Sequence, residues 1–195
     1  MLLQYLESEN LRLSTLKRVA IGGSACPRSM IDTFETKYGV EVMHAWGMTE
    51  MSPIGSYSTL KPEVADLKGT ALYDLKQKQG FAPFTVEMKI TDDEGKILPW
   101  DGKTFGRLKV RGPAVSKAYY GLDDNILDED GYFDTGDVAT IDEHGYMNIT
   151  DRAKDVIKSG GEWISSIDLE NIAMAHPSVA MAACIAAFHP KWDER

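Results

Sequence analysis

The sequence holds few cysteines, no block of basic residues and no long apolar run. Its 195 residues include only 2 cysteines, Cys26 and Cys184, which lie far apart within apolar stretches. This pattern excludes a disulfide framework and argues against a structural zinc site, and it favours reduced thiols in a cytosolic protein. Lysine and arginine number 21 against 30 acidic residues, which gives a net charge of −9. That balance argues against a nucleic-acid partner.

Signals for membranes and for secretion are also missing. The first stretch, "MLLQYLESENLRLSTLK", carries acidic residues where a signal peptide needs an unbroken apolar core. No apolar run reaches the length of a membrane-spanning helix. We therefore expect a cytoplasmic globular protein without a transmembrane segment, long enough for one domain or one domain and part of another. The composition leaves homo-oligomerisation open.

Two familiar catalytic patterns fail on inspection. The stretch "DGKT" at residues 101–104 ends like a phosphate-binding loop, but Ile97 stands where that motif needs its first glycine. The sequence holds four histidines, His44, His144, His176 and His189. Their spacing matches neither a zinc site nor a recognisable serine triad.

The first part of the chain is typical of a strand-helix-strand unit. Residues 2–9 resemble the end of a helix, and "LKRVAIGG" is typical of a buried strand that ends in two glycines. Pro27 is well placed to open a helix that runs through Phe34 to Tyr38, and "GVEVMHAWG" follows as the next strand. This order predicts two parallel strands whose loops gather at their carboxyl ends.

The pattern changes after Pro53. The stretches "FTVEMKITDDEGKILP", "FGRLKVRG" and "GYFDTGDVATIDEHGYMNIT" predict antiparallel strands, with turns at "DDEG" and "DEHG". From about Asp151, "AKDVIKSGG" predicts a short strand and a glycine loop, "SSIDLENIAMAH" a helix, and "VAMAACIAAF" another strand. Ser165 or Ser166 is expected to cap this helix. Its buried face is expected to hold Leu169, Ile172 and Ala173.

Two groups of residues at strand ends could bind a ligand. The glycines of "GGSACP", residues 22–27, allow a flat ligand to approach the backbone, although taken alone they favour a tight turn between strand and helix. In "AWGMTEMSP", residues 45–53, Trp46 could stack on a base, Thr49 could donate to a phosphate oxygen and Glu50 could hold Mg²⁺. The alternative is a loop with a buried tryptophan and a helix cap.

A third group lies in "GYFDTGDVATIDEHGYMNITDRAKDVIKSGGEWIS". Asp137 could accept both hydroxyls of a ribose, and Arg152 could reach a phosphate or the same sugar. The alternative makes Asp137 a turn residue and Arg152 half of a surface ion pair.

Taken in this order, the three groups resemble the adenylate-forming superfamily, which includes acyl-CoA synthetases, luciferases and peptide-synthetase adenylation domains. "HAWGMTEMSP" and "SGGEWISSIDLEN" are most similar to the medium-chain fatty acyl-CoA ligase branch. The resemblance covers essentially the whole chain and implies a mixed α/β and β fold. Residues 1–150 would be the last part of the large AMP-binding domain, with a βαβ unit and an antiparallel subdomain. Residues 151–154 would be the hinge, and residues 155–195 the start of the small α+β domain.

The resemblance also implies roles for individual residues. Nucleotide contacts would come from Gly23, Ser24, Ala45, Trp46, Gly47, Met48, Thr49, Asp137 and Arg152. Thr49 would contact the α-phosphate, and Glu50 would hold the magnesium ion. Lys154 would be the hinge residue. Lys158 would act in catalysis beside Thr49 and Glu50, and it would share the loop that lines the coenzyme A tunnel with Gly160, Gly161 and Glu162.

The implied reaction has two halves. A carboxylic acid, expected to be a medium-chain or related fatty acid, reacts with ATP to give an acyl adenylate, and coenzyme A then displaces AMP. The family's upstream phosphate loop and its lysine near the end of the small domain are absent from this sequence. We therefore expect an internal part of such an enzyme, with little or no turnover alone. Two alternatives stay open, namely a nucleotide-binding module without turnover and an adenylating enzyme that uses another acceptor, such as a carrier protein or oxygen.

Overall fold

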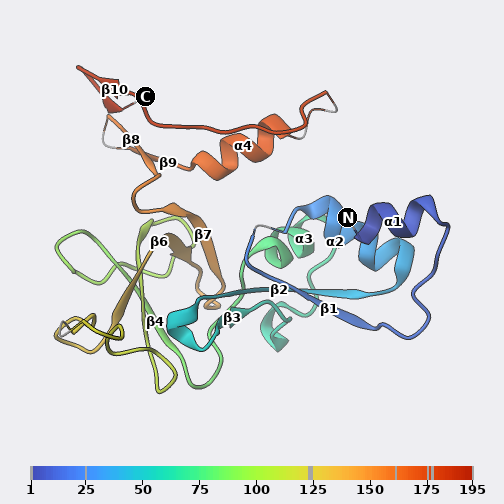
Figure 1. Ribbon diagram of the computed structural model, residues 1–195, viewed down its shortest axis with the longest axis horizontal. Helices are drawn as coiled ribbons and strands as arrows, with labels where there is room; N and C mark the ends of the chain where they lie inside the picture. Colours follow the sequence, from blue (N-terminus) through green and yellow to red (C-terminus); the bar gives the residue numbers. More distant parts are fainter. Residues whose placement is uncertain are drawn as a thin grey trace.

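The computed structural model describes residues 2–24, 26–122, 125–160, 162–174, 176 and 178–194. In chain order its elements are α1 (Leu2–Ser8), β1 (Arg18–Ile21), α2 (Arg28–Asp32), the π-helical turn η1 (Thr33–Lys37), β2 (Glu41–Gly47), the 3-10 turn η2 (Thr49–Met51), β3 (Ile54–Tyr57), the 3-10 turn η3 (Pro62–Val64), α3 (Gly69–Gln77), β4 (Glu87–Thr91), β5 (Gly106–Arg111), β6 (Phe133–Ile141), β7 (Met147–Arg152), β8 (Ile157–Ser159), β9 (Glu162–Ile164), α4 (Ser166–Met174), β10 (Phe188–His189) and β11 (Asp193–Glu194). Within the described residues these strands form three sheets, ordered β1-β2-β3, β4-β5-β6-β7 and β10-β11-β8-β9. Figure 1 shows the three regions, with α4 and β8 set apart from the other two.

The first region contains the expected strand-helix-strand unit. Strands β1 and β2 pair in parallel, with Val19 opposite Val42, and α2 lies between them in the chain. Apolar side chains of α2, η1 and β2 close a small core around Ile31 and Phe34. The prediction of parallel strands is confirmed. Strand β3, which pairs antiparallel with β2, was not predicted, because its four residues "IGSY" are too few to show a period.

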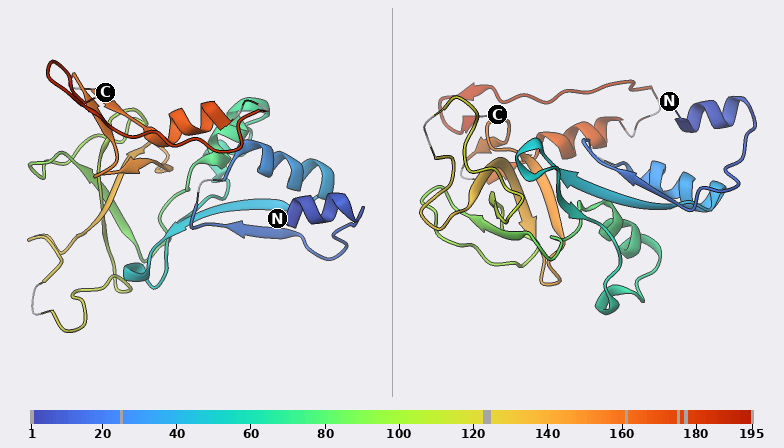
Figure 2. Two further views of the ribbon diagram at one scale, coloured as in Figure 1. Left: turned by 45° about the horizontal axis from the view of Figure 1, so that its top comes forward. Right: turned by 60° about the horizontal axis from the view of Figure 1, so that its bottom comes forward.

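The second region is the expected antiparallel meander, seen from two further sides in Figure 2. Burial alternates along β5, where Leu108 and Val110 point into the core and the residues between them are partly exposed. The "DEHG" turn joins β6 to β7, and it closes with a hydrogen bond of 3.1 Å from the Asp142 N–H to the Tyr146 carbonyl. Both features agree with the alternating sequence pattern.

Helix α3 was also missed by the sequence analysis. It begins at Gly69, which adopts a φ of +58°, and it buries Leu75 against Val64 and Tyr146. Its sequence, "GTALYDLKQ", opens with poor helix formers, so its formation depends on this tertiary contact. The helix ends beside the strands of the first sheet and brings two glutamine residues toward the site described below.

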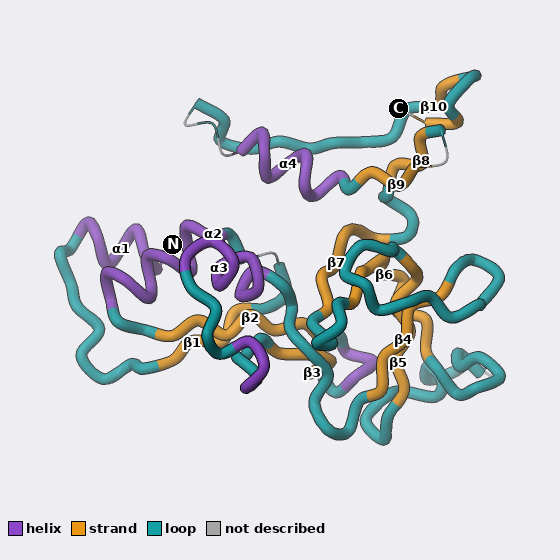
Figure 3. The backbone as a smooth tube through the Cα atoms, turned by 180° about the vertical axis from the view of Figure 1, so that it is seen from behind, coloured by secondary structure: helices purple, strands orange, loops and turns teal. Residues whose placement is uncertain are grey.

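The third region begins after β7, as Figure 3 shows from behind. Helix α4 is capped by Ser165, whose Oγ accepts the Asp168 N–H at 3.0 Å and donates to the Thr150 carbonyl at 2.7 Å. The Asp151 carboxylate accepts the Ser166 N–H at 2.8 Å. Of the two expected caps the structure therefore selects Ser165, and it ties the start of α4 to β7.

Two expectations for this region are wrong. Leu169 and Ile172 were expected on the buried face of α4, but they are 42% and 71% exposed. Residues 179–188 were expected to form a strand, yet Phe188 alone among them lies in one, the two-residue strand β10. The reason is the same in both cases. An apolar helix face or an apolar strand needs a neighbour to cover it, and no described element packs there.

The remaining expectations about composition concern thiols and membranes. Cys26 and Cys184 are both free cysteines, the first buried and the second partly exposed. No helix among the described residues is both long enough and apolar enough to cross a bilayer.

We predict that Ser165→Ala lowers the free energy of unfolding by about 0.5–2 kcal/mol, because the N-cap of α4 loses its acceptor. Amide hydrogen exchange at Asp168 should become faster in the same variant. Ser166→Ala is the matched control, since Ser166 makes its contact to Asp151 through the backbone N–H. Equal exchange at Asp168 in the two variants would contradict the assignment of the cap.

Candidate functional site

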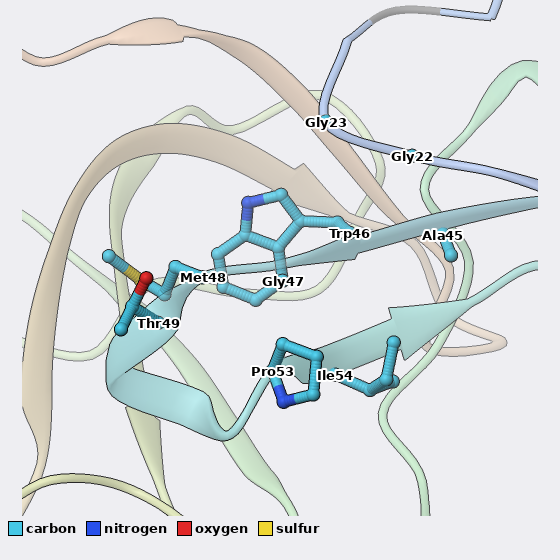
Figure 4. Close-up of a pocket in the computed structure, with 9 residues that line it drawn as sticks. All are labelled: Gly22, Gly23, Ala45, Trp46, Gly47, Met48, Thr49, Pro53 and Ile54. Carbon is cyan, nitrogen blue, oxygen red and sulfur yellow. The ribbon is translucent and has the colours of Figure 1, made fainter.

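The site begins where the two parallel strands end. Gly22 and Gly23 follow β1, and Ala45 to Gly47 form the end of β2. They surround a hollow of about 270 Å³. Its lining consists of Gly22, Gly23, Ala45, Trp46, Gly47, Met48, Thr49, Pro53 and Ile54. Figure 4 shows these residues with the Trp46 ring in the middle of the group. The first two groups singled out in the sequence therefore share one surface.

The position of the Trp46 ring depends on Gly55, which has no side chain. A Cβ atom at Gly55 of β3 would lie 2.2 Å from Cζ3 of the Trp46 ring. The indole therefore packs directly on the backbone of β3, while Trp46 also lines the hollow. Its Nε1–H donates a hydrogen bond of 3.0 Å to Oδ2 of Asp137, 91 positions later in the chain. This bond joins the second and third groups of residues.

Asp137 and Arg152 lie opposite each other on β6 and β7. Oδ1 of Asp137 and Nη1 of Arg152 are 3.0 Å apart, and their side chains are 4% and 54% exposed. Burial raises the pKa of Asp137 above its ordinary value of 3.8, although the Arg152 charge and the Trp46 hydrogen bond act in the opposite direction. Asp137 is therefore a buried strand residue and not a turn residue, which removes half of the simpler interpretation.

A larger cleft connects these groups. Its volume is about 1010 Å³, and it is lined by Gly23, Ser24, Ala45, Trp46, Gly47, Asp137 and Arg152 among others. Met48 and Thr49 belong to the smaller hollow that shares Trp46 with it. The structure thus brings together nine residues that the resemblance linked to a nucleotide. Their role as nucleotide contacts stays a prediction.

Several lining residues escaped the sequence analysis. His44, Gln77, Gln79, Asn148 and Arg28 also face the cleft. The His44 ring is buried, with Nδ1 2.8 Å from the Gln77 carbonyl and Nε2 3.4 Å from the Ser24 carbonyl. Burial lowers the pKa of His44, so the ring is neutral near pH 7 and the shorter contact favours a proton on Nδ1. Gln77 and Gln79 escaped because α3 was not foreseen, whereas His44 was seen only as one of four histidines and as part of "HAWGMTEMSP", with no role assigned to it.

Glu50 stands beside the hollow on η2. Its Oε1 accepts a hydrogen bond of 2.8 Å from the Tyr119 hydroxyl, and its carbonyl accepts the Ser116 N–H at 2.8 Å. Among the described residues no three His, Cys, Asp or Glu side chains gather as a metal site. Mg²⁺ commonly takes one or two protein carboxylates together with substrate phosphates, so Glu50 fits it as one ligand among phosphate oxygens.

The residues expected on the coenzyme A side lie elsewhere. Lys154 is exposed in the turn after β7. Lys158 on β8 has its Nζ 3.5 Å from the Asp93 carboxylate and 4.8 Å from the centre of the Trp163 ring. A Cβ at Gly160 would lie 2.9 Å from the Trp192 ring. Glu162 pairs through its backbone with Ser159 of β8. Gly161 lies outside the described residues. None of the described members of this set lines the cleft.

Comparison with known proteins identifies the family of this chain. A family model described as AMP-binding enzyme matches residues 1–120. The chain belongs to this family. The 3-methylmercaptopropionyl-CoA ligase of Ruegeria lacuscaerulensis is 56% identical over 184 residues, which are 94% of this chain and 34% of that protein. The medium-chain-fatty-acid–CoA ligase of Ectopseudomonas oleovorans is 55% identical over 181 residues, 93% of this chain and 33% of that protein.

Solved structures agree with the family. The o-succinylbenzoate CoA synthetase of Bacillus subtilis, in complex with an acyl-adenylate intermediate, matches with a TM-score of 0.81 and 29% identity over 99% of this chain and 38% of its own. ATP-bound MatB from Rhodopseudomonas palustris matches with a TM-score of 0.73 and 28% identity over 90% of this chain and 33% of its own. The expected superfamily and mixed fold are confirmed. This AMP-binding chain spans about a third of the length of the curated relatives that it matches.

We predict that Gly55→Ala displaces the indole, because the new Cβ would overlap Cζ3 and Cε3 of Trp46 at 2.2 and 2.5 Å. Overpacking of this kind costs about 1–3 kcal/mol of stability. The indole N–H resonance of Trp46 should shift as its bond to Asp137 breaks, which NMR of the nitrogen-15-labelled chain would detect.

Gly69→Ala serves as the control for this variant. Its added Cβ would meet nothing within 4 Å, although φ at Gly69 is +58°. It should therefore strain the backbone and leave the Trp46 resonance in place. An unshifted resonance in Gly55→Ala would contradict the packing described for Trp46.

Proposed function

We propose that this chain supplies the nucleotide side of the active site of an ATP-dependent acyl-CoA ligase. The observation that carries the proposal is the convergence of Trp46, Asp137 and Arg152 on one cleft, although they come from two different sheets. Family membership and the CoA ligase names of the relatives support the same activity. A carboxylic acid, ATP and coenzyme A are the proposed substrates.

Each part of the nucleotide has a proposed place in this geometry. Trp46 and the glycines after β1 offer a flat apolar hollow for the base. Asp137 has one partner on each oxygen, and an ionised carboxylate keeps further acceptor capacity for ribose hydroxyls. Arg152 supplies the positive charge beside it. Thr49 and Glu50 stand at the other edge of the hollow, where the phosphates would lie, and bound Mg²⁺ would there neutralise phosphate charge next to Glu50.

The proposed reaction needs two kinds of positioning. In the first half a carboxylate oxygen attacks the α-phosphorus of ATP, and pyrophosphate leaves. In the second half the sulfur of coenzyme A attacks the acyl carbonyl, and AMP leaves while water is kept out. Residues 155–195 would move between two poses about Lys154, so that Lys158 and the glycine loop face the site only in the second half. The boundaries 1–150, 151–154 and 155–195 belong to this proposal.

The acyl group is proposed as an aliphatic chain of medium or related length. The two ligases named above are almost equally similar, at 56% and 55% identity, so similarity alone does not choose between their acids. Free cysteines and an acidic composition support a cytoplasmic location.

The proposal is tested in a chimera that carries this chain in place of the matching residues of the Ectopseudomonas oleovorans ligase. We expect AMP release from ATP, octanoate and coenzyme A. Asp137→Ala should lower kcat/KM for ATP in the first half-reaction by roughly 10- to 100-fold, the range for lost hydrogen bonds to a charged group. The second half-reaction should also slow, because the acyl adenylate carries the same ribose. Asp66→Ala, at an exposed position outside the cleft, is the control. A folded chimera without turnover, or an undiminished Asp137→Ala variant, would defeat the proposal.

A second variant separates the hinge from the nucleotide site. Lys154→Pro fixes φ in the turn after β7 and should block the rotation of residues 155–195. We expect pyrophosphate exchange within about twofold of the parent and thioester formation reduced at least about tenfold. Single-turnover measurements of the two half-reactions provide the comparison. Equal losses in both halves would show that Lys154 is not the hinge.

A further inference from the structure

Glu50 is held by a loop that the nucleotide motifs do not include. The connection between β5 and β6, residues 112–132, passes beside η2. Its Tyr119 hydroxyl donates to Glu50 Oε1 at 2.8 Å, and its Ser116 N–H donates to the Glu50 carbonyl at 2.8 Å. One contact fixes the side chain of Glu50 and the other fixes its backbone. Both come from a segment more than sixty residues away in sequence.

The near end of this loop is anchored in the core. Val115 is 8% exposed and packs in the same apolar cluster as Met51, the residue after Glu50. Its N–H also donates to the Gly112 carbonyl at 3.1 Å, which closes a tight turn at the end of β5. Ser116 and Tyr119 therefore follow shortly after a residue that is packed in the core.

The far end of the loop is anchored by charge. The Tyr132 ring lies between two cations, 4.0 Å from Lys89 Nζ and 4.6 Å from the Arg111 guanidinium. Lys89 in turn pairs with Asp130 at 3.1 Å and with Asp128 at 3.6 Å. These contacts fasten residues 128–132 to β4 and β5. With both ends fixed, the hydrogen bond from Tyr119 costs little additional ordering of the chain.

We propose that Tyr119 is a positioning residue that orients the Glu50 carboxylate for the Mg²⁺ that accompanies ATP. The inference rests on the proposed function, in which Glu50 is the protein ligand of that ion. The phenol takes one acceptor position of Oε1, so the second carboxylate oxygen has the greater capacity for the cation. A glutamate with one oxygen tethered in this way gives up less rotamer freedom when it binds a metal.

The neighbouring residue provides a matched control. Tyr119 is 44% exposed and bonded to Glu50, whereas Tyr120 is fully exposed. Tyr119→Phe and Tyr120→Phe each remove one hydroxyl from the same loop and keep the ring. Equal melting temperatures for the two variants would establish that the loop is intact in both.

The experiment measures Mn²⁺ binding by electron paramagnetic resonance in the chimera, in the presence of a non-hydrolysable ATP analogue. Tyr119→Phe should weaken Mn²⁺ binding roughly tenfold, as expected for one hydrogen bond to a charged group, and Tyr120→Phe should not. The concentration of Mg²⁺ for half-maximal pyrophosphate exchange should rise by the same factor, with kcat at saturating Mg²⁺ little changed.

A double-mutant cycle with Glu50→Gln completes the test. If Tyr119 acts through Glu50, adding Tyr119→Phe to Glu50→Gln should produce no further loss. Additive losses would overturn the inference, and so would a loss confined to Glu50→Gln, which leaves the proposed function standing. If neither variant changes Mn²⁺ binding, the assignment of Glu50 itself is wrong, and the inference falls with it.

Discussion

The hydrogen bond between the Trp46 indole and Asp137 is the contact on which the rest of the site depends. It links β2 of the first sheet to β6 of the meander, and the Trp46 ring also packs against the buried cluster that holds Ala139 and Ile141 of β6. A carboxylate as buried as Asp137 is costly unless donors surround it. Trp46 and Arg152 provide one donor for each oxygen, and the same three groups define the middle of the cleft. Trp46 and Asp137 thus contribute both to the junction of the two sheets and to the lining of the cleft.

The second requirement of the site is glycine at positions 47 and 55. A Cβ at Gly47 would lie 1.9 Å from the Pro53 carbonyl oxygen, and one at Gly55 would enter the Trp46 ring. The backbone after β2 therefore turns back tightly on β3 only because these positions are glycine. Gly47 also lines the hollow, together with Gly22 and Gly23. The shape of the hollow therefore depends on the two glycines as much as on the side chains that line it.

Much of this architecture could be predicted from local patterns. The parallel pair, the meander with its "DEHG" turn and the cap at Ser165 each follow from a few adjacent residues. Strand β3 and helix α3 could not be predicted, because four residues show no period and the α3 sequence is a poor helix former outside its tertiary contacts. The exposed Leu169 and Ile172 have the opposite cause, since their apolar spacing is clear and a covering element is what the described chain lacks.

The candidate site also has a part that the sequence indicated and a part that it did not. The residue types at Trp46, Asp137 and Arg152 indicated a nucleotide, but the bond across 91 positions is a tertiary fact that no local pattern contains. The same holds for Tyr119 and Glu50, which lie 69 positions apart. Gln77 and Gln79 line the cleft because helix α3, which was not foreseen, ends at Gln77, and the Gln77 carbonyl there contacts the His44 ring.

The attachment of α4 to β7 bears on how fast the two poses could interchange. Asp151 lies before Lys154, and the helix it helps to hold lies after it, so rotation about Lys154 must part Asp151 from the Ser166 N–H and Ser165 from the Thr150 carbonyl. A buried acid would then lose one of its donors at the moment of departure. In the proposed rotation, breaking the hydrogen bond between Asp151 and the Ser166 N–H would therefore contribute to the barrier, although Asp151 takes no part in the reaction itself.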